Sequence, residues 1–258
     1  MVIDGRQIAS SILEKLKKQA KPKKTLVAVL VGNDPASISF LKQKEKTAAL
    51  LGVKFRLYKF SERISEQKLK SEIIKLNKNP QIGGIILQLP LPRKINQEAI
   101  IQALEIKKDV DALKSSKLVL PPAVGVLKII LESIRLNLKN KETIVMGRGI
   151  LVGEPIAKWL HGRVKKLTVF HSRFFDKKIL KVADLIVSGV GKAGLILWGD
   201  IKKGSVIIDF GYSFRKGKVS GDFDFESCRK QARFITPTPG GTGPILVAKL
   251  FENYYQLT

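Results

Sequence analysis

The sequence predicts a two-domain α/β fold: an N-terminal α/β domain, then a Rossmann-type domain with a parallel sheet. Three observations lead to this prediction. Short apolar, β-branched runs alternate with helical patterns, which favours parallel strands joined by helices. A second strand–turn–helix series begins after Pro121 and Pro122. The length of 258 residues is sufficient for two modest domains.

In the first half, strands are expected at 25–31, 53–60 and 84–88, and helices at 10–18, 36–51, 65–77 and 97–104. The run 25–31 is continuously apolar, as in a strand buried on both faces. Asp34 is a good helix N-cap, and Pro35 suits the first helical position. Gly52 is expected to end the helix that they begin.

The helix at 36–51 carries the first candidate side chains. Ser37, Phe40 and Lys44 share one face of it because they are three and four residues apart. Spacing does not separate Lys44 from Lys42 and Lys46, which we expect at the surface.

The strand at 84–88 leads into Gln88-Leu89-Pro90-Leu91-Pro92. Parallel α/β sheets place ligands at the carboxyl ends of their strands, so Gln88 is a candidate site residue. The alternative is a stiff connection without a role in binding. Asp109 and Asp111 follow the next helix; no third ligand lies nearby, so we predict no metal site. An aspartate in this basic chain could instead bind a cationic or amidine-like group.

The second half opens on a strand at 143–146, a turn with Gly147, Gly149 and Gly153, and a helix at 153–160. Glycine lets the backbone approach a diphosphate, and a helix N-terminus attracts its charge. The spacing is one residue longer than the usual dinucleotide fingerprint. An ordinary glycine-rich turn is therefore the alternative. The prediction is completed by a helix at 126–138, strands at 167–171, 184–188 and 206–209, a short helix at 179–182 and a helix at 245–255.

The strand at 167–171 ends in His171-Ser172-Arg173, where an NAD site usually carries an acidic residue. Serine and arginine can hold a 2′-phosphate, so NADP is favoured, with NAD as the alternative. The later segment 235–244 contains three prolines and three glycines. This composition predicts a rigid loop whose backbone approaches a ligand.

Composition excludes several classes of protein. No apolar run reaches 18 residues, so no membrane-spanning helix is expected. The start has no secretory layout, and the single Cys228 suits the reducing cytoplasm. The formal net charge of +25 favours anionic ligands. Lysines are spread along the chain and no nucleic-acid motif is present, so nucleic-acid binding is only a minor alternative.

Taken together, these segments resemble the bifunctional methylenetetrahydrofolate dehydrogenase/methenyltetrahydrofolate cyclohydrolase family. The resemblance runs in order over nearly the whole chain. Its most specific blocks are Gln88–Pro92 and Pro239–Pro244. It also includes Asp4-Gly5, residues 32–37, Lys44 with Lys46, residues 108–111, residues 147–155, His171-Ser172 and residues 190–192.

The resemblance implies a folate-binding catalytic domain at 1–118 with 238–258, and an NADP-binding domain at 119–237. It implies catalytic roles for Lys44, Gln88 and Asp111: Lys44 as the main catalytic residue, Gln88 as its hydrogen-bond partner and Asp111 as the anchor of the pterin. The implied substrate-binding residues are Ser37, Phe40, Leu89, Pro90, Pro239, Gly240 and Gly241. The implied cofactor-binding residues are Gly147, Arg148, Gly149, Val152, Gly153, His171, Ser172, Arg173, Val190 and Gly191. It further implies tetrahydrofolate substrates, possible polyglutamate tails and a homodimer.

Several residues depart from the family pattern. The family usually has tyrosine at Phe40, serine at Gly149 and glycine at Ala112. Ser213 and Ile245-Leu246 also differ from the usual residues. The loss of a hydroxyl at Phe40 leaves an alternative, a dehydrogenase with weak or lost cyclohydrolase activity. Because Lys44, Gln88 and Asp111 are all retained, we expect an active bifunctional enzyme.

Overall fold

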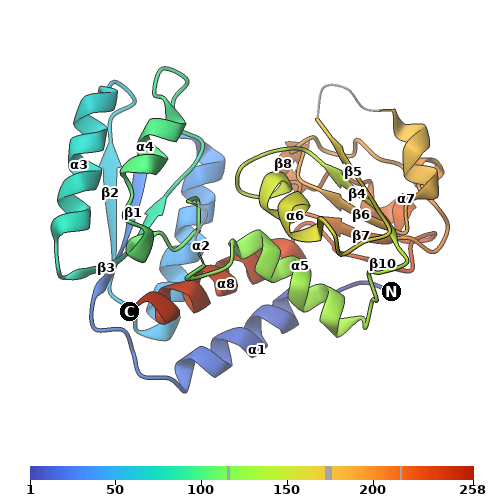
Figure 1. Ribbon diagram of the computed structural model, residues 1–258, viewed down its shortest axis with the longest axis horizontal. Coiled ribbons are helices and arrows are strands. Elements are labelled where there is room, and N and C mark those ends of the chain that lie inside the picture. Colours follow the sequence, from blue (N-terminus) through green and yellow to red (C-terminus); the bar gives the residue numbers. More distant parts are fainter. Residues whose placement is uncertain (115–116, 172–175, 216) are drawn as a thin grey trace. The chain divides into compact units, whose positions relative to one another are not determined.

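The computed structural model describes residues 1–114, 117–171, 176–215 and 217–258. The chain forms two compact units (Figure 1). The three-stranded unit comprises residues 10–122 and 247–258, and the five-stranded unit comprises residues 1–9 and 123–246. The division falls within α1 (Gly5–Lys17) and α8 (Thr242–Leu257) and just after the start of α5 (Pro122–Ser133).

The three-stranded unit contains a parallel sheet in the order β2-β1-β3 (Figure 1). Its strands are β1 (Thr25–Val31), β2 (Phe55–Phe60) and β3 (Ile82–Leu87). Six of the seven residues of the central strand β1 are buried, as the continuous apolar run predicts. Because β1 and β3 pair in parallel, their carboxyl ends lie beside each other at one edge of the sheet.

Local sequence accounts for the helices of this unit, which are α2 (Pro35–Leu51), α3 (Glu66–Lys78), α4 (Gln97–Ala103) and the short 3₁₀ helix η1 (Ile106–Lys108). Asp34 caps α2 by accepting a hydrogen bond from the Ser37 amide. Gly52 ends it in the left-handed conformation with φ of 65°. Both features confirm the sequence prediction.

The C-terminal half of α8 packs on the three-stranded sheet. The Tyr254 hydroxyl donates to the carbonyl of Lys24 at 2.6 Å, and Asn253 Nδ2 donates to the carbonyl of Val110 at 2.9 Å. A Cβ atom at Gly84 of β3 would lie 2.8 Å from the Tyr254 ring. Glycine at this position lets the aromatic ring lie directly against the strand.

The five-stranded unit contains a parallel sheet in the order β10-β7-β6-β4-β5 (Figure 1). The strands are β4 (Glu142–Met146), β5 (Lys166–Phe170), β6 (Leu185–Ser188), β7 (Val206–Asp209) and β10 (Phe234–Ile235). The chain leaves β4 to form β5 on one side and returns to form β6 on the other. This reversal of strand order is where open α/β sheets bind ligands. Fold class and parallel sheets are thus as predicted.

The structure corrects some of the predicted elements. Helix α5 spans 122–133 rather than 126–138, because Pro122 occupies its first turn and does not break it. The element predicted as a short helix near 179–182 is a 3₁₀ helix, η2 (Lys177–Val182). The sequence reading did not predict β10, the hairpin of β8 (Ser213–Arg215) and β9 (Lys218–Ser220), helix α7 (Phe225–Cys228), or the 3₁₀ helix η3 (Trp198–Asp200).

The core of the five-stranded unit lies around β4, β6 and β7, with Ile144, Ile186 and Ile207 among its buried residues. Cys228 is buried in this core on α7 and packs as a small apolar side chain. In the part of the chain that the structure describes, no helix is long and apolar enough to cross a bilayer.

Candidate active site

Lys44 is a buried lysine in the middle of helix α2, with 7% of its surface exposed. Its Nζ donates a hydrogen bond of 3.1 Å to Oε1 of Gln88. Lys42 and Lys46 on the same helix are exposed. Burial therefore distinguishes Lys44 from its neighbours, which the spacing of lysines alone does not.

Gln88 follows β3 at the carboxyl edge of the three-stranded sheet. Its backbone amide donates to the carbonyl of Val29 in β1, so the sheet itself fixes the backbone of Gln88. Its Nε2 donates to the carbonyl of Leu89 at 3.0 Å, which leaves Oε1 oriented toward the amine of Lys44. The side chain is thus held as a neutral acceptor.

The loop after Gln88 is shaped by a cis peptide bond between Leu89 and Pro90. The carbonyl of Leu89 accepts from Gln88 and, at 3.4 Å, from the hydroxyl of buried Ser37. Leu89 is buried and Pro90 is exposed. The structure therefore brings Ser37, Lys44, Gln88 and Leu89 together. Phe40 lies on α2, partly buried, one turn before Lys44.

Electrostatics couple Lys44 to Asp111. Burial lowers the pKa of the Lys44 amine from its usual 10.5, and the charge of Asp111 acts in the opposite direction. Burial likewise raises the pKa of the Asp111 carboxyl, against the effect of Lys44. In both residues desolvation outweighs the partner's charge. The pair can thus carry protons closer to neutral pH than either free side chain can.

Two lysines hold the segment that carries Asp111. Lys108 Nζ donates to the carbonyls of Leu76 and Asn79 at the end of α3, and Lys114 Nζ donates to the carbonyl of Leu104 just after α4. Such bonds satisfy carbonyls that have no partner within the helix. One end of the segment is therefore anchored to the end of α3 and the other to the end of α4.

Asp109 supports the turn between these anchors. It is 2% exposed, forms a bridge to Ile85 of β3, and accepts a 2.8 Å hydrogen bond from the Lys114 amide at Oδ2. Burial raises the pKa of Asp109 to about 6, although amide hydrogen bonds from Lys114 and Leu113 oppose the shift. The sequence reading treated Asp109 and Asp111 as a pair. The structure separates them, because Asp109 bonds to the turn and Asp111 is coupled to Lys44.

Ala112, in the same turn, has a φ of 50°, in the left-handed region that glycine adopts without strain. We expect Ala112→Gly to raise the free energy of unfolding by about 0.5–1 kcal/mol, because relief of strain exceeds the added entropy of the unfolded chain. The midpoint of urea unfolding measures this change. Ala99→Gly, in the interior of α4, should have the opposite effect. A lower midpoint for Ala112→Gly would contradict the explanation.

The second group of predicted residues lies at the carboxyl edge of the five-stranded sheet. Gly147 follows β4 with a φ of 93°, and a Cβ atom there would lie 2.8 Å from the carbonyl oxygen of Gly189. Gly189 follows β6, so the turns after the two adjacent strands are in contact. Sequence reasoning missed Gly189, although a glycine at a strand end was the available signal.

The glycines after Gly147 leave the start of helix α6 (Gly153–Leu160) open to a ligand. A Cβ atom at Gly153 would lie 1.9 Å from the Gly147 carbonyl oxygen, whereas one at Gly149 would meet no atom within 4 Å. The N-cap residue of α6 is Val152, which makes no side-chain capping bond. An anion can therefore take the place of a capping side chain, and the turn fits a diphosphate.

His171 follows β5, the other neighbour of β4. It is exposed, and its Nε2 lies 3.3 Å from Nη1 of Arg148 in the glycine turn. Ser172 and Arg173, the predicted 2′-phosphate residues, lie outside the described residues. The structure thus brings Arg148 and His171 together beside the turn, and the roles of all these residues stay predictions.

Pro239, Gly240 and Gly241 belong to the five-stranded unit. The bond between Thr238 and Pro239 is cis, and Gly240 has a φ of 102°. A Cβ atom at Gly5 would lie 1.7 Å from the carbonyl oxygen of Gly241, so the loop rests directly on the start of α1. This contact explains why glycine is needed at position 5. The predicted approach of this loop to folate stays a prediction.

Comparisons with known proteins match both halves of the chain to domains of one enzyme family. Residues 3–111 match the model of the tetrahydrofolate dehydrogenase/cyclohydrolase catalytic domain. Residues 121–258 match the model of the NAD(P)-binding domain of the same enzymes. The bifunctional protein FolD of Bacillus velezensis is 35% identical over 270 residues, covering 98% of this chain and 95% of that protein.

Solved structures give the same result. The chain is similar to the bifunctional FolD methylenetetrahydrofolate dehydrogenase/cyclohydrolase of Campylobacter jejuni, with 30% identity, a TM-score of 0.92, and coverage of 100% of this chain and 98% of that one. It is also similar to the Trypanosoma brucei enzyme complexed with NADP and an inhibitor, with 28% identity, a TM-score of 0.92, and coverage of 100% and 96%. The chain therefore belongs to the tetrahydrofolate dehydrogenase/cyclohydrolase family.

Proposed function

We propose that the chain is a bifunctional enzyme of one-carbon metabolism. It oxidises 5,10-methylenetetrahydrofolate to 5,10-methenyltetrahydrofolate with NADP, and then hydrolyses that product to 10-formyltetrahydrofolate. Membership of the family supports both activities. The observation that carries the proposal is the buried amine of Lys44, held at 3.1 Å by the neutral side chain of Gln88.

NADP, when bound, would supply the hydride acceptor for the methylene carbon of the folate, whose oxidation gives a cationic methenyl group. Lys44 then acts on the water that adds to this carbon: Nζ accepts a proton from the water. As the bond between the carbon and the ring nitrogen breaks, Nζ returns this proton to that nitrogen. The hydroxyl left by the water loses its remaining proton to solvent as the formyl C=O bond forms. A lowered pKa makes the neutral amine more available for this task at neutral pH.

Gln88 and Asp111 are proposed to support this chemistry in different ways. The Gln88 oxygen orients the Lys44 amine without adding charge, so it does not raise the amine's pKa as a carboxylate would. The Asp111 carboxylate anchors the amidine-like edge of the pterin. The folate is proposed to contact Ser37, Phe40, Leu89, Pro90 and the Pro239–Gly241 backbone.

Residues at the carboxyl edge of the five-stranded sheet are proposed to hold NADP. The turn with Gly147, Gly149 and Gly153 and the start of α6 bind the diphosphate. The proposed site is completed by the other residues expected to contact NADP, which are Arg148, Val152, His171, Ser172, Arg173, Val190 and Gly191. The proposed preference for NADP over NAD is tested by titrating the Arg173→Ala variant with each cofactor. Loss of the arginine should weaken the binding of NADP more than the binding of NAD.

Finer parts of the proposal concern the whole protein. We propose that residues 1–118 with 238–258 form the folate domain and 119–237 the NADP domain. The protein is proposed to act as a homodimer in the cytoplasm, to accept polyglutamylated folates at its many lysines, and to supply 10-formyltetrahydrofolate for purine biosynthesis. The single cysteine supports a reducing compartment. Sedimentation velocity of the purified protein tests the dimer.

A two-step assay tests the proposed function. Purified protein is given methylenetetrahydrofolate with NADP, and the absorbances of NADPH and of the methenyl intermediate are followed together. In a second cuvette, methenyltetrahydrofolate alone reports ring opening. The proposal requires enzyme-dependent NADPH formation in the first cuvette and enzyme-dependent loss of methenyl absorbance in the second. Absence of either activity would overturn the proposal of a bifunctional enzyme.

Phe40 provides a separate prediction for the hydrolytic step. Phe40 and Lys44 are four residues apart on α2 and so lie on one face. Phe40→Tyr should increase the rate of ring opening about five- to tenfold, because a hydroxyl adds a hydrogen bond beside the reacting groups. The assay with methenyltetrahydrofolate measures this rate, and the oxidation rate serves as the control. An unchanged ring-opening rate would show that the hydroxyl is dispensable in this chain.

A further inference from the structure

Asp222 is a buried carboxylate that the proposed chemistry does not use. It lies between β9 and α7 in the five-stranded unit and is 0% exposed. Its Oδ2 accepts hydrogen bonds from the Ser188 hydroxyl at 2.5 Å and the Val190 amide at 2.8 Å, and its Oδ1 accepts one from the Lys192 amide at 2.7 Å. Hydrogen bonds to a carboxylate are stronger than those between neutral groups.

All three donors belong to one short segment, Ser188–Lys192. It begins at the last residue of β6 and continues as the turn at the carboxyl edge of the sheet. A Cβ atom at Gly189 would lie 2.8 Å from Cγ1 of Val152, and Gly189 also contacts Gly147. The segment therefore packs against the glycine turn proposed to bind the diphosphate, and it contains Val190 and Gly191 of the proposed cofactor site.

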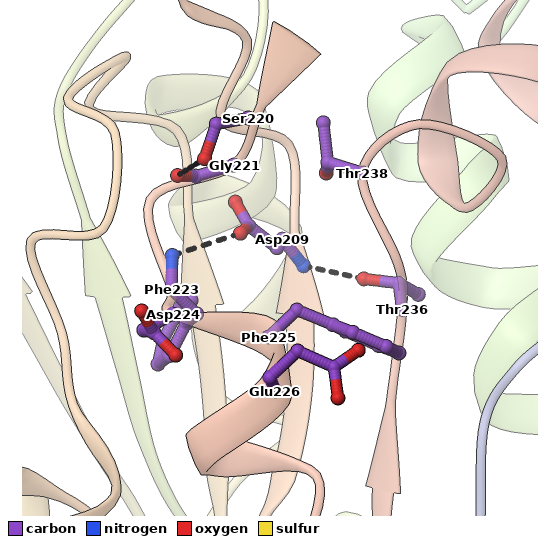
Figure 2. A pocket seen from close by; sticks show the side chains of 9 residues that line it. All are labelled: Asp209, Ser220, Gly221, Phe223, Asp224, Phe225, Glu226, Thr236 and Thr238. Carbon is purple, nitrogen blue, oxygen red and sulfur yellow. Dashed lines mark hydrogen bonds between the residues drawn. The ribbon is translucent and has the colours of Figure 1, made fainter. Parts of the chain in front are cut away.

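A second carboxylate, that of Asp209 at the end of β7, fixes the segment that carries Asp222. Asp209 Oδ2 accepts from the Phe223 amide at 3.0 Å and Oδ1 from the Gly211 amide at 2.7 Å, and Figure 2 shows the bond to Phe223. A Cβ atom at Gly211 would lie 2.5 Å from Oδ1 of Asp222. The Asp222 carboxylate is thus confined between the Gly211 backbone and the donors of Ser188–Lys192.

The cavity beside Asp209 does not account for this arrangement. It has a volume of about 160 Å³ and is lined by Asp209, Thr236, Thr238 and Glu226 among others (Figure 2). Cofactor pockets usually measure roughly 300–1,000 Å³. The three bonds of Asp222 go instead to the backbone and side chain of the turn after β6. The arrangement therefore favours a role in fixing that turn.

We propose that Asp222 is a positioning residue for NADP, which holds the Ser188–Lys192 segment in the conformation that the cofactor requires. The inference rests on the proposed function and assigns to Asp222 no contact with the cofactor. A carboxylate is suited to the task because its two oxygens accept hydrogen bonds, and all three hydrogen-bond partners are donors. An asparagine would direct its own N–H groups at one or more of these donors.

Asp222→Asn tests the inference. We expect the Kd of NADP, measured by calorimetry without folate, to rise about tenfold, because a buried donor loses its acceptor. The KM for NADP should rise by a similar factor, while kcat at saturating NADP changes less than about twofold. In the protein without NADP, the Val190 and Lys192 amides should exchange hydrogen faster than in the wild type.

Asp224→Asn is the matched control. Asp224 lies two residues away and caps α7 by accepting from the Ser227 amide at 3.1 Å. This variant should bind NADP as the wild type does. If Asp222→Asn does not fold, Ser188→Ala provides a second test, because it keeps the carboxylate and removes one donor; about a threefold rise in Kd is expected.

The outcomes separate the inference from the proposed function. Unchanged NADP affinity in Asp222→Asn, or in Ser188→Ala where the first variant does not fold, would overturn the inference alone. A fall in kcat with an unchanged KM would also overturn it, since that result indicates loss of folded enzyme. Failure of the wild type to bind NADP would overturn the proposed function and, with it, this inference.

Discussion

Lys44→Met is expected to lower the rate of methenyltetrahydrofolate hydrolysis by at least about 100-fold, the usual contribution of a positioned proton-transfer group. Methionine has a similar length but cannot accept or donate a proton. The amine that it replaces is buried and held by Gln88 at 3.1 Å. The two-step folate assay on wild type and variant measures the loss in both activities.

The pH profile links this loss to the amine. Because burial lowers the pKa of Lys44, the wild-type hydrolysis rate should rise with pH through an inflection below 10.5, as the amine loses its proton. The variant should lack this inflection. Lys46→Met, at an exposed position of the same helix, should keep the wild-type rate and profile. Hydrolysis by Lys44→Met above about a tenth of the wild-type rate would refute the proposed role.

Local patterns predicted much of the three-stranded unit. The apolar run at 25–31 became β1, and Asp34 and Gly52 set the limits of α2 as expected. These features depend on neighbours in sequence, so the sequence contains the information. The special position of Lys44 cannot be predicted from its neighbours in sequence. Its burial and its bond to Gln88 require strand β3 to lie beside α2. At the level of sequence, spacing does not distinguish this lysine from its neighbours, and only the resemblance to a family identifies it.

The features that the sequence reading missed in the five-stranded unit depend on distant contacts. Strand β10 has two residues and exists by pairing with β7, and the strands β8 and β9 of the hairpin have three residues each. Such segments carry too few residues for a period to be recognised. Asp222 bonds to donors 30–34 residues earlier in the chain. No local motif marks it, so only the folded chain reveals its contacts.

The start of α5 shows a different source of error. The two consecutive prolines, Pro121 and Pro122, predict a break in the chain and a helix that begins only at 126. Proline is disfavoured inside a helix but suited to its first turn, where its missing N–H group would have no partner. The structure uses Pro122 in this second way. A single residue type therefore supported two opposite predictions, and the apolar residues Ala123 and Val124, both buried, decided between them.

Gly153→Ala is expected to weaken NADP binding by about 100-fold, because the turn loses hydrogen bonds to the charged diphosphate, each of which contributes roughly 1.5–3 kcal/mol. The added Cβ atom would lie 1.9 Å from the Gly147 carbonyl oxygen and 2.6 Å from its carbonyl carbon. Both are backbone atoms, which cannot rotate away as a side chain can. The turn must therefore open, and its amide groups move away from the diphosphate. Calorimetric titration with NADP measures the loss.

Two other glycines of the five-stranded unit separate this effect from a general intolerance of substitution. A Cβ atom at Gly199, in η3, would meet no atom within 4 Å, so Gly199→Ala should bind NADP like the wild type. Gly149 is equally open, so Gly149→Ser should fold normally and add a hydroxyl donor to the proposed phosphate site. If Gly153→Ala bound NADP as tightly as Gly199→Ala, the diphosphate could not lie on this turn. The cofactor would then have to occupy a different part of the sheet edge.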